Sequence, residues 1–340
     1  MFANLRLRWW AVIAAFGLVA PVSASAALLE ANDPGLAAHP MIVVGQSPDS
    51  PANHVDPNTT SSPFAGVGSL KVVWGANTYI GSGAVIGPTR ILTAAHMFDL
   101  DNNGSIDVAP GDVTFYLNYG SDLSHAITAA SLYVHPDWSG FNNPSVLDDV
   151  AVIELSSPVP AGVPMYALNS DPFTAATEIT LVGYGRSGDG VNGYTTSASW
   201  TVKRSGKNLA SFFVLDDEGS GNKEGFEFDF DFPTKDAFDT VLGLGNTVEV
   251  TLGPGDSGGP SFIPDGSGGY KIFGVNTFGF DYSSYKAPLF GSGAGGMLVS
   301  SYKSWIESVP EPGSVVIWLV GCGGLGLISV TRRHRRTARA

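Results

Sequence analysis

The chain has 340 residues, including 43 glycines and 22 prolines, and its formal net charge is −13. Seven of its 18 basic residues lie in residues 1–26 and 313–340, so the body between them, residues 27–312, carries 11 basic against 31 acidic residues. Such an acidic body excludes nucleic acid and anionic membrane surfaces as binding partners. The single cysteine, Cys322, lies in the C-terminal segment, so the folded body is expected to have no internal disulfide.

Residues 1–26 have the pattern of a secretory signal peptide. Arg6 and Arg8 precede an apolar stretch that ends near Val22, and Ala24-Ser25-Ala26 offers small residues for signal peptidase. The apolar stretch is short for a membrane span, which favours cleavage over a membrane anchor. We therefore expect an exported protein.

A leader and one large β domain are expected after the signal. Residues 27–63 are rich in Pro, Ser, Asn and Asp, and they predict a leader or propeptide arm. Residues 64–308 contain short β-branched or apolar runs separated by turn residues, which predict an all-β sandwich or barrel. One helix is expected, at Ser301–Glu307. The expected strands are Ser69–Trp74, Ala84–Ile86, Val113–Leu117, Ala151–Leu155, Ile179–Val182, Ser199–Val202, Thr247–Thr251 and Ile272–Val275.

An acidic, glycine-rich segment at about 187–246 reads as an elaborated loop region with its own hairpin. Within it, residues 227–232 alternate Glu or Asp with Phe. A strand there would place three phenylalanines on one face and three carboxylates on the other.

Three short motifs carry the chemistry of nucleophilic catalysis. A serine hydroxyl needs a base within hydrogen-bond reach, a group that orients that base, and donors for the oxyanion. Ser257 lies in Gly-Asp-Ser-Gly-Gly-Pro, where flanking glycines allow a sharp turn. His96 ends Leu-Thr-Ala-Ala-His after an apolar strand, and Asp149 opens the apolar run Val-Ala-Val-Ile. These residues predict a nucleophile, a base and an orienting acid.

The three motifs and their order, His96, Asp149, Ser257, resemble the trypsin/chymotrypsin family of serine proteases. The order differs from those of subtilisin and the α/β-hydrolases. Gly183-Tyr184-Gly185 and Tyr302–Ile306 also resemble family segments, so the resemblance spans about residues 64–307. It implies two packed six-stranded antiparallel β-barrels with a short C-terminal helix, and it marks His135, in His-Pro-Asp-Trp, as a non-catalytic turn residue.

The resemblance also implies roles for residues around the nucleophile. The backbone N–H groups of Gly255 and Ser257 would form the oxyanion hole. Thr251, six residues before the nucleophile, would occupy the base of the specificity pocket, and Thr277-Phe278-Gly279 would form its wall. Because Thr251 is neutral, we expect no preference for Lys or Arg.

Activation by a new N-terminus is a further implication of the resemblance. In many relatives the new amine is buried against the aspartate before the nucleophile, here Asp256. Ile42-Val43-Val44-Gly45 resembles the usual start of the mature enzyme. Val55 is the alternative, and it is favoured by its offset to His96. A buried ammonium would pair with Asp256, which otherwise needs another partner.

A candidate calcium loop follows His96. Oxygen ligands fall at positions 1, 3, 5 and 9 of the loop, with glycine at position 6. Position 12 is Pro110 rather than Glu, although Asp112 is close, and an Asx-rich turn is the alternative. Catalysis itself is expected to need no cofactor. The candidate structural Ca²⁺ ligands are Asp99, Asp101, Asn103, Ser105 and Asp107.

The C-terminal segment, residues 309–340, combines Pro310-Glu311-Pro312, an uncharged apolar run over 313–330, and an arginine cluster. The run is long enough to span a bilayer, with the arginines on the cytoplasmic side. This order resembles the PEP-CTERM sorting signal of Gram-negative bacteria. The resemblance implies processing by an exosortase and delivery to the cell surface or matrix, and a plain membrane anchor is the alternative.

These patterns predict a monomeric, exported serine endopeptidase that acts on protein or peptide substrates through an acyl-enzyme. Two other functions remain open at this point. One is a surface-displayed pseudoprotease or matrix-binding protein with the same fold, and the other is an acyl ester hydrolase.

Overall fold

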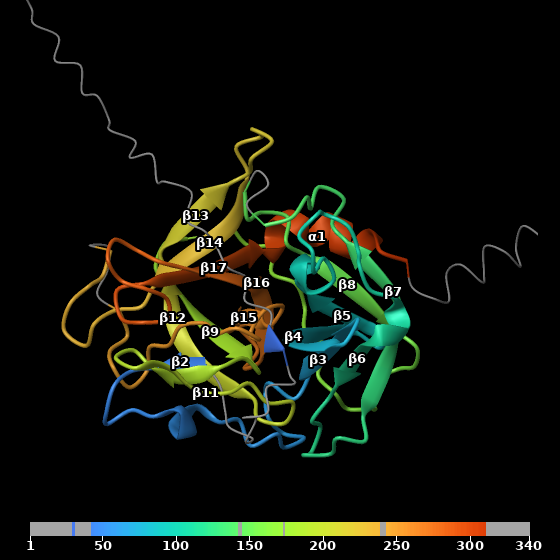
Figure 1. Cartoon of the computed structure of the whole chain (residues 1–340), viewed down its shortest axis with the longest axis horizontal. Helices are drawn as coiled ribbons and strands as arrows, with labels where there is room; N and C mark the ends of the chain where they lie inside the picture. The colour runs from blue at the N-terminus through green and yellow to red at the C-terminus, as the bar shows by residue number, and fades with distance from the viewer. Residues whose placement is uncertain (1–28, 31–41, 142–144, 173, 239–242, 311–340) are drawn as a thin grey trace, which may run out of the picture.

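The computed structural model describes residues 29–30, 42–141, 145–172, 174–238 and 243–310, and these residues are mostly β-strand. The expected signal peptide lies outside the described residues, and so does the C-terminal tail from residue 311 onward. Within the described part of the chain, no helix has the length and apolar character needed to cross a membrane. Figure 1 shows two β-units side by side, with helix α1 (Val299–Ser308) at their upper junction.

The first unit is a closed barrel of six strands with one further strand at its edge. The ring runs β4-β3-β6-β7-β8-β5, and a pairing between β4 and β5 closes it. Alternating apolar residues point into the barrel, as Val113 and Phe115 of β6 do, and both are fully buried. The expected six-stranded barrel is thus confirmed for this unit. Its strands are β3 (Val67–Trp74), β4 (Asn77–Gly87), β5 (Arg90–Thr93), β6 (Val113–Tyr116), β7 (Ala126–Val134) and β8 (Ala151–Leu155), and β1 (Leu29–Glu30) pairs with β4.

The second unit is an open seven-stranded sheet, so the expected second six-stranded barrel is wrong. Its order is β12-β9-β15-β16-β17-β14-β13, and no pairing among the described residues joins its two ends. The strands are β9 (Thr177–Gly183), β12 (Arg204–Ala210), β13 (Phe212–Leu215), β14 (Lys223–Asp229), β15 (Pro260–Pro264), β16 (Tyr270–Phe280) and β17 (Gly293–Leu298).

The gap between β12 and β14 explains why this sheet stays open. The expected strand at Thr247–Thr251 forms only isolated bridges, and one of them joins Glu249 to Lys207 of β12. The Asn208 amide, also on β12, donates hydrogen bonds of 2.8 Å to the carbonyls of Asp229 and Val250. A buried side chain therefore makes the contact that a strand ladder would make in a closed barrel.

The alternating segment at residues 227–232 differs from a strand with one solvated face. β14 ends at Asp229, and Phe228 and Phe230 are fully buried, as expected for the apolar face. The carboxylates of Asp229 and Asp231 are also buried, at 3% and 5% exposure. The 243–251 segment covers them, since the N–H groups of Gly243 and Asp231 bond to the side chains of Asp231 and Glu249 respectively.

Two shorter features complete the fold. The expected C-terminal helix is confirmed as α1 (Val299–Ser308), whose Tyr302 and Ile306 are buried. The expected strand at Ser199–Val202 is wrong, because that stretch is irregular. A three-stranded sheet is formed by β2 (Ile42–Val44), β10 (Ser187–Asp189) and β11 (Gly193–Thr196). It holds residues 42–44 against the second unit, where Val43 pairs with Thr251. Three 3₁₀ turns lie at Pro51–His54, Ala95–Met97 and Pro110–Asp112.

Candidate active site

His96 and Asp149 lie together at one end of the closed barrel. β5 and β8 pair antiparallel with Thr93 opposite Ala151, so the residue segments just beyond this pair are neighbours. His96 Nδ1 lies 2.6 Å from Asp149 Oδ2, and the His96 backbone N–H donates to Asp149 Oδ1 at 2.8 Å. Both side chains are buried, at 2% and 0% exposure. Two bonds to one carboxylate thus fix the position of the imidazole.

The second ring nitrogen of His96 is unoccupied. Nε2 is buried and has no hydrogen-bond partner among the described residues. Because Asp149 accepts from Nδ1–H, the neutral ring carries its lone pair on Nε2. The ring of Phe141 packs against the imidazole with centroids 4.9 Å apart. The arrangement leaves a positioned base with a free lone pair.

The Ser257 loop comes from the open sheet and packs against the barrel. Ser82 of β4 donates from its N–H to Ser257 O at 2.8 Å, and from its hydroxyl to Gly255 O at 2.9 Å. Gly258 has φ +78°, and a Cβ there would lie 1.9 Å from Thr93 Oγ1. Only glycine permits this approach to the strand that leads to His96. Sequence reasoning missed Ser82, because its role depends on contacts between the two units.

The turn before Ser257 presents two unused backbone donors. Gly255 has φ +99°, a conformation that favours glycine. Among the described residues, neither the Gly255 N–H nor the Ser257 N–H donates a hydrogen bond within the fold. Two adjacent free donors can stabilise an oxyanion.

The comparison with protein families agrees with this geometry. The Trypsin family model matches residues 56–212. The match includes His96 and Asp149 and ends before Ser257. It supports a trypsin-like serine protease fold and a serine-type peptidase activity. A comparison with curated proteins found no match.

Asp256 directly precedes Ser257 in the same loop. It is fully buried and accepts hydrogen bonds from the N–H groups of Gly185 at 2.8 Å and Gly253 at 2.9 Å. Burial raises the pKa of Asp256 to about 7, because desolvation outweighs these two bonds. Among the described residues this carboxyl group forms no ion pair, and the charge of Arg204 only partly opposes the rise in its pKa.

Arg204 is a cation whose charge acts on Asp256. It is fully buried, its Nε donates to Pro51 O, and neither terminal nitrogen has a hydrogen-bond partner among the described residues. Burial lowers the pKa of Arg204 to about 9, and attraction to Asp256 opposes this shift. Sequence reasoning missed Arg204, because it approaches the loop only through its pairing with Gly183.

The expected pocket residues lie beside the Ser257 loop. The Gly258 N–H donates to Asn276 O at 2.8 Å, which places the following Thr277 and Phe278 next to the loop. Thr251, Thr277 and Phe278 are all buried, and Thr277 Oγ1 has no hydrogen-bond partner in the described structure. The backbone of Thr251 pairs with that of Val43. The side chains of Thr251, Thr277 and Phe278 are all uncharged.

The candidate calcium loop brings its acids together. Carboxylate oxygens of Asp99, Asp101 and Asp107 lie within 4.8 Å of one another. Asp99 accepts from the N–H groups of Asn103 and Gly104, and Asp107 accepts from those of Leu100 and Asp101. Asn103 Oδ1 and the Ser105 N–H bond to each other within the loop at 2.9 Å.

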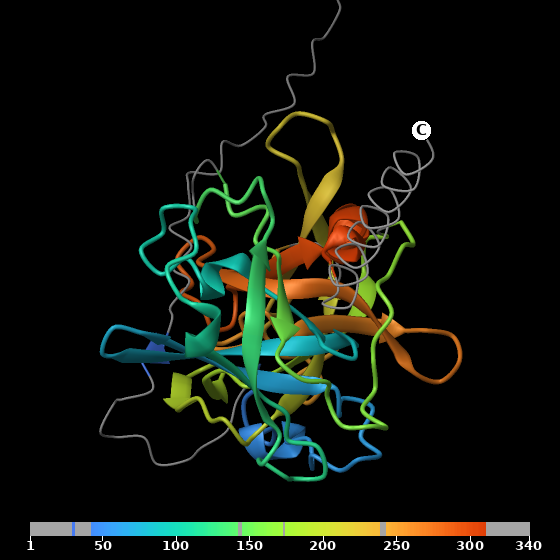
Figure 2. The ribbon, with the colours of Figure 1, turned by 90° about the vertical axis from the view of Figure 1, so that its right-hand side faces the viewer.

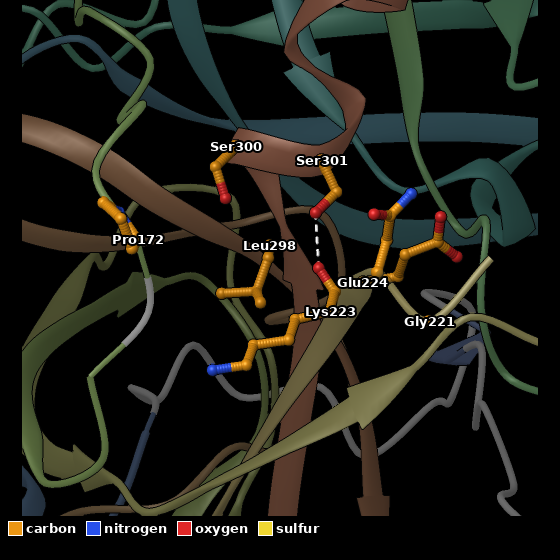
Figure 3. A pocket seen from close by; sticks show the side chains of 8 residues that line it. Pro172, Gly221, Lys223, Glu224, Leu298, Ser300 and Ser301 are labelled. Atoms are coloured by element: carbon orange, nitrogen blue, oxygen red, sulfur yellow. Dashed lines mark hydrogen bonds between the residues drawn. The ribbon is translucent and has the colours of Figure 1, made fainter.

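A separate pocket of about 520 Å³ lies between the β13–β14 hairpin and the start of α1. Figure 3 shows Lys223, Glu224 and Ser301 at its rim, with the Ser301 hydroxyl bonded to the Lys223 carbonyl. None of His96, Asp149 and Ser257 lines it. We assign it no part in the chemistry of the trypsin-like site.

Proposed function

We propose that this protein is an exported serine endopeptidase with Ser257 as nucleophile, His96 as general base and Asp149 as the orienting acid. One observation carries the proposal. The imidazole of His96 is fixed by two bonds to Asp149 and keeps Nε2 free, on the strand end against which the Ser257 loop packs.

The chemical steps follow from this arrangement. His96 Nε2 takes the hydroxyl proton as Ser257 Oγ attacks the peptide carbonyl, and Asp149 stabilises the resulting imidazolium. The N–H groups of Gly255 and Ser257 bind the developing oxyanion, and one such donor is worth about 3 kcal/mol in the transition state. His96 then protonates the leaving amine. Water, activated by the same imidazole, hydrolyses the acyl-enzyme and regenerates the Ser257 hydroxyl.

Hydrolysis of a protein substrate by matched variants tests this function. The Ser257→Ala enzyme is expected to lose about 10⁶-fold in kcat, the scale seen when a serine nucleophile is removed. Ser267→Ala changes an exposed loop serine and should keep full activity. Unchanged proteolysis by Ser257→Ala would reject the assignment. Activity on ester but not protein substrates would identify an esterase, and absence of both in the wild type a pseudoprotease.

We also propose a neutral specificity pocket with Thr251 at its base and Thr277, Phe278 and Gly279 along its wall. The burial of Thr251 and its position beside the nucleophile loop support this assignment. Such a pocket favours apolar or small polar side chains, because a buried cation would find no carboxylate partner there.

Cleavage before Ile42 is the activation step that we favour over cleavage before Val55. Ile42 is fully buried, and its strand pairs with Ser187–Asp189 and with Thr251, whereas Val55 is 40% exposed. Ile42 also has φ +68°, a costly conformation for a β-branched residue. Cutting the preceding peptide bond removes that constraint and creates an ammonium for the partner-poor Asp256. N-terminal sequencing of the active enzyme should therefore begin at Ile42 and not at Val55.

A structural Ca²⁺ in the 99–107 loop is a further part of the proposal. The carboxylates of Asp99, Asp101 and Asp107 lie within 4.8 Å of one another, and a cation between them would relieve their mutual repulsion. The ion would use oxygen ligands, as calcium prefers, and would stiffen the segment after His96.

Export and surface delivery complete the proposed function. The sequence patterns of residues 1–26 and 309–340 support processing by a signal peptidase and an exosortase. The acidic body, with 11 basic against 31 acidic residues, suits a soluble monomer outside the cell.

A further inference from the structure

A histidine and two aspartates converge on the barrel side of α1, outside the proposed catalytic site. The His135-Pro136-Asp137-Trp138 segment forms a turn in which the Trp138 N–H donates to His135 O at 3.1 Å. His135 Nδ1 lies 3.3 Å from Asp148 Oδ1 and 3.8 Å from Asp137 Oδ2. One ligand atom from each of these residues falls within a common radius of 4.8 Å.

His135 is held in place with its Nδ1 available. The ring packs edge-on against Tyr302 and Trp305, with centroids 5.0 Å away in each case. The His135 backbone N–H bonds to Val150 O at 3.0 Å. Nδ1 is buried, and in the described part of the chain it has no hydrogen-bond partner. This nitrogen therefore faces the carboxylates of Asp137 and Asp148.

Asp148 is equally constrained. Its backbone has φ +62°, and its N–H donates to the Tyr302 hydroxyl at 3.1 Å. Oxygens of Glu218 and Glu224 also lie within 4.8 Å of an Asp148 oxygen. The only basic group in ion-pair contact with Asp137 or Asp148, among the described residues, is His135.

We propose that His135, Asp137 and Asp148 bind a divalent transition-metal ion of the zinc class. One imidazole nitrogen with two carboxylate oxygens is a donor set that Zn²⁺ accepts, whereas Ca²⁺ prefers oxygen ligands alone. Tetrahedral ligands at their usual distances from Zn²⁺ lie roughly 3.3 Å apart. The separation of His135 Nδ1 and Asp148 Oδ1 already equals this edge.

The remaining geometry can close around an ion. The Asp137 side chain is 59% exposed, so it can move the short distance that separates it from an ideal ligand position. Solvent supplies the fourth ligand on the exposed side. The ion lies one residue from Asp149, on the segment that leads into β8.

Isothermal titration of ZnCl₂ into the secreted Ser257→Ala protein tests the site, since this variant cannot digest itself. Saturating Ca²⁺ in the buffer keeps the 99–107 loop from competing. One Zn²⁺ per chain is expected. Asp137→Asn should weaken binding by at least about 100-fold, more than the 10- to 100-fold loss typical of outer-shell changes. His135→Gln should have the same effect.

Two comparisons separate a loss of the metal site from a loss of folding. Asp137→Asn changes an exposed side chain and should leave folding intact, whereas His135→Gln removes packing against α1. His125→Gln alters a second histidine–aspartate pair, with Asp122 at 3.6 Å, that has no third ligand among the described residues. It should not change Zn²⁺ affinity. Zn²⁺ binding that survives Asp137→Asn and His135→Gln, or no Zn²⁺ binding by the parent protein, would overturn the proposal.

Discussion

Buried carboxylates have different partners in the closed barrel and in the open sheet. In the barrel, Asp149 is bonded to both the ring and the backbone of His96. In the open sheet, Asp229, Glu249 and Asp256 are buried with backbone or amide donors, and none forms an ion pair among the described residues. Burial raises their pKa values to about 8, 7 and 7 respectively.

This contrast teaches how the site is assembled. The barrel supplies a histidine–aspartate pair that is complete within one unit. The sheet supplies the Ser257 loop, whose neighbour Asp256 still lacks a close cation. Figure 2 shows the barrel strands of the first unit alongside the orange strands of the second. Proteolytic release of the Ile42 amine would supply the missing cation for Asp256. The histidine–aspartate pair of the barrel would thus be formed before this cleavage, and the Ser257 loop of the sheet would be completed only after it.

The largest effect is expected from breaking the barrel pair. Asp149→Asn removes the acceptor for His96 Nδ1–H and favours the wrong tautomer, so kcat should fall by about 10⁴-fold. Steady-state hydrolysis of a fluorogenic peptide measures this loss, with circular dichroism to check the fold. Asp137→Asn in metal-free buffer is the matched control and should keep full activity. A loss below 10-fold would contradict the role of Asp149.

A change in the sheet unit should alter specificity instead of turnover. Thr251→Asp places a carboxylate at the proposed base of the pocket, so cleavage after Lys or Arg should improve about 10- to 100-fold relative to apolar residues. Competition between peptide libraries measures the ratio. Thr277→Ser changes the wall without adding charge and should leave the neutral preference unchanged. If Thr251→Asp leaves the ratio unchanged too, Thr251 does not contact the substrate side chain.

The pH dependence of stability should also come from the sheet. Burial raises the pKa of Glu249 from 4.5 to about 7, so the folded state holds its proton more tightly than the unfolded chain does. Its contribution is complete below pH 4.5 and is lost as the pH rises through 7. Glu249→Gln should reduce the difference in the free energy of unfolding between pH 5 and pH 8 by an amount on the order of 1 kcal/mol.

Urea unfolding at pH 5 and pH 8 measures that slope. Glu178→Gln is the control, because Glu178 is half-exposed on neighbouring β9 and pairs with Lys207 at 2.7 Å. It should leave the pH dependence unchanged. Equal flattening by both variants would mean that the burial of Glu249 does not govern the slope.

The smallest effect is expected from the candidate calcium loop at residues 99–107 of the barrel. Saturating Ca²⁺ should raise the Tm by about 2 to 4 °C, because it binds the folded state alone. Asp101→Asn should abolish the shift, whereas Asp122→Asn in a distant exposed loop should preserve it. A shift that persists in Asp101→Asn would place the ion elsewhere.

The sequence predicted the barrel better than the sheet for a physical reason. Short alternating runs such as Val113–Leu117 reveal a half-buried strand from local spacing alone. The strings around His96 and Asp149 are also local, and they mark two residues that the fold brings to 2.6 Å. Closure of the second unit instead depends on Asn208 meeting residues 21 and 42 positions away in the chain.

The charged interior was equally hidden from the sequence. Alternation at residues 227–232 correctly separates phenylalanines from carboxylates, but it cannot reveal that residues 243–251 cover the acidic face. Arg204 likewise follows no motif, and its effect on Asp256 depends on the pairing of β12 with β9. Local patterns predict elements, whereas the partners of buried charges depend on tertiary contacts.

The central claim is that the two units build one active site around Ser257. A fluorophosphonate probe, which labels an activated serine, tests it most directly when the modified peptide is mapped by mass spectrometry. We predict one adduct per chain on Ser257, and none in the His96→Ala enzyme, because the hydroxyl then lacks its base. Labelling at another residue, or undiminished labelling without His96, would contradict the account.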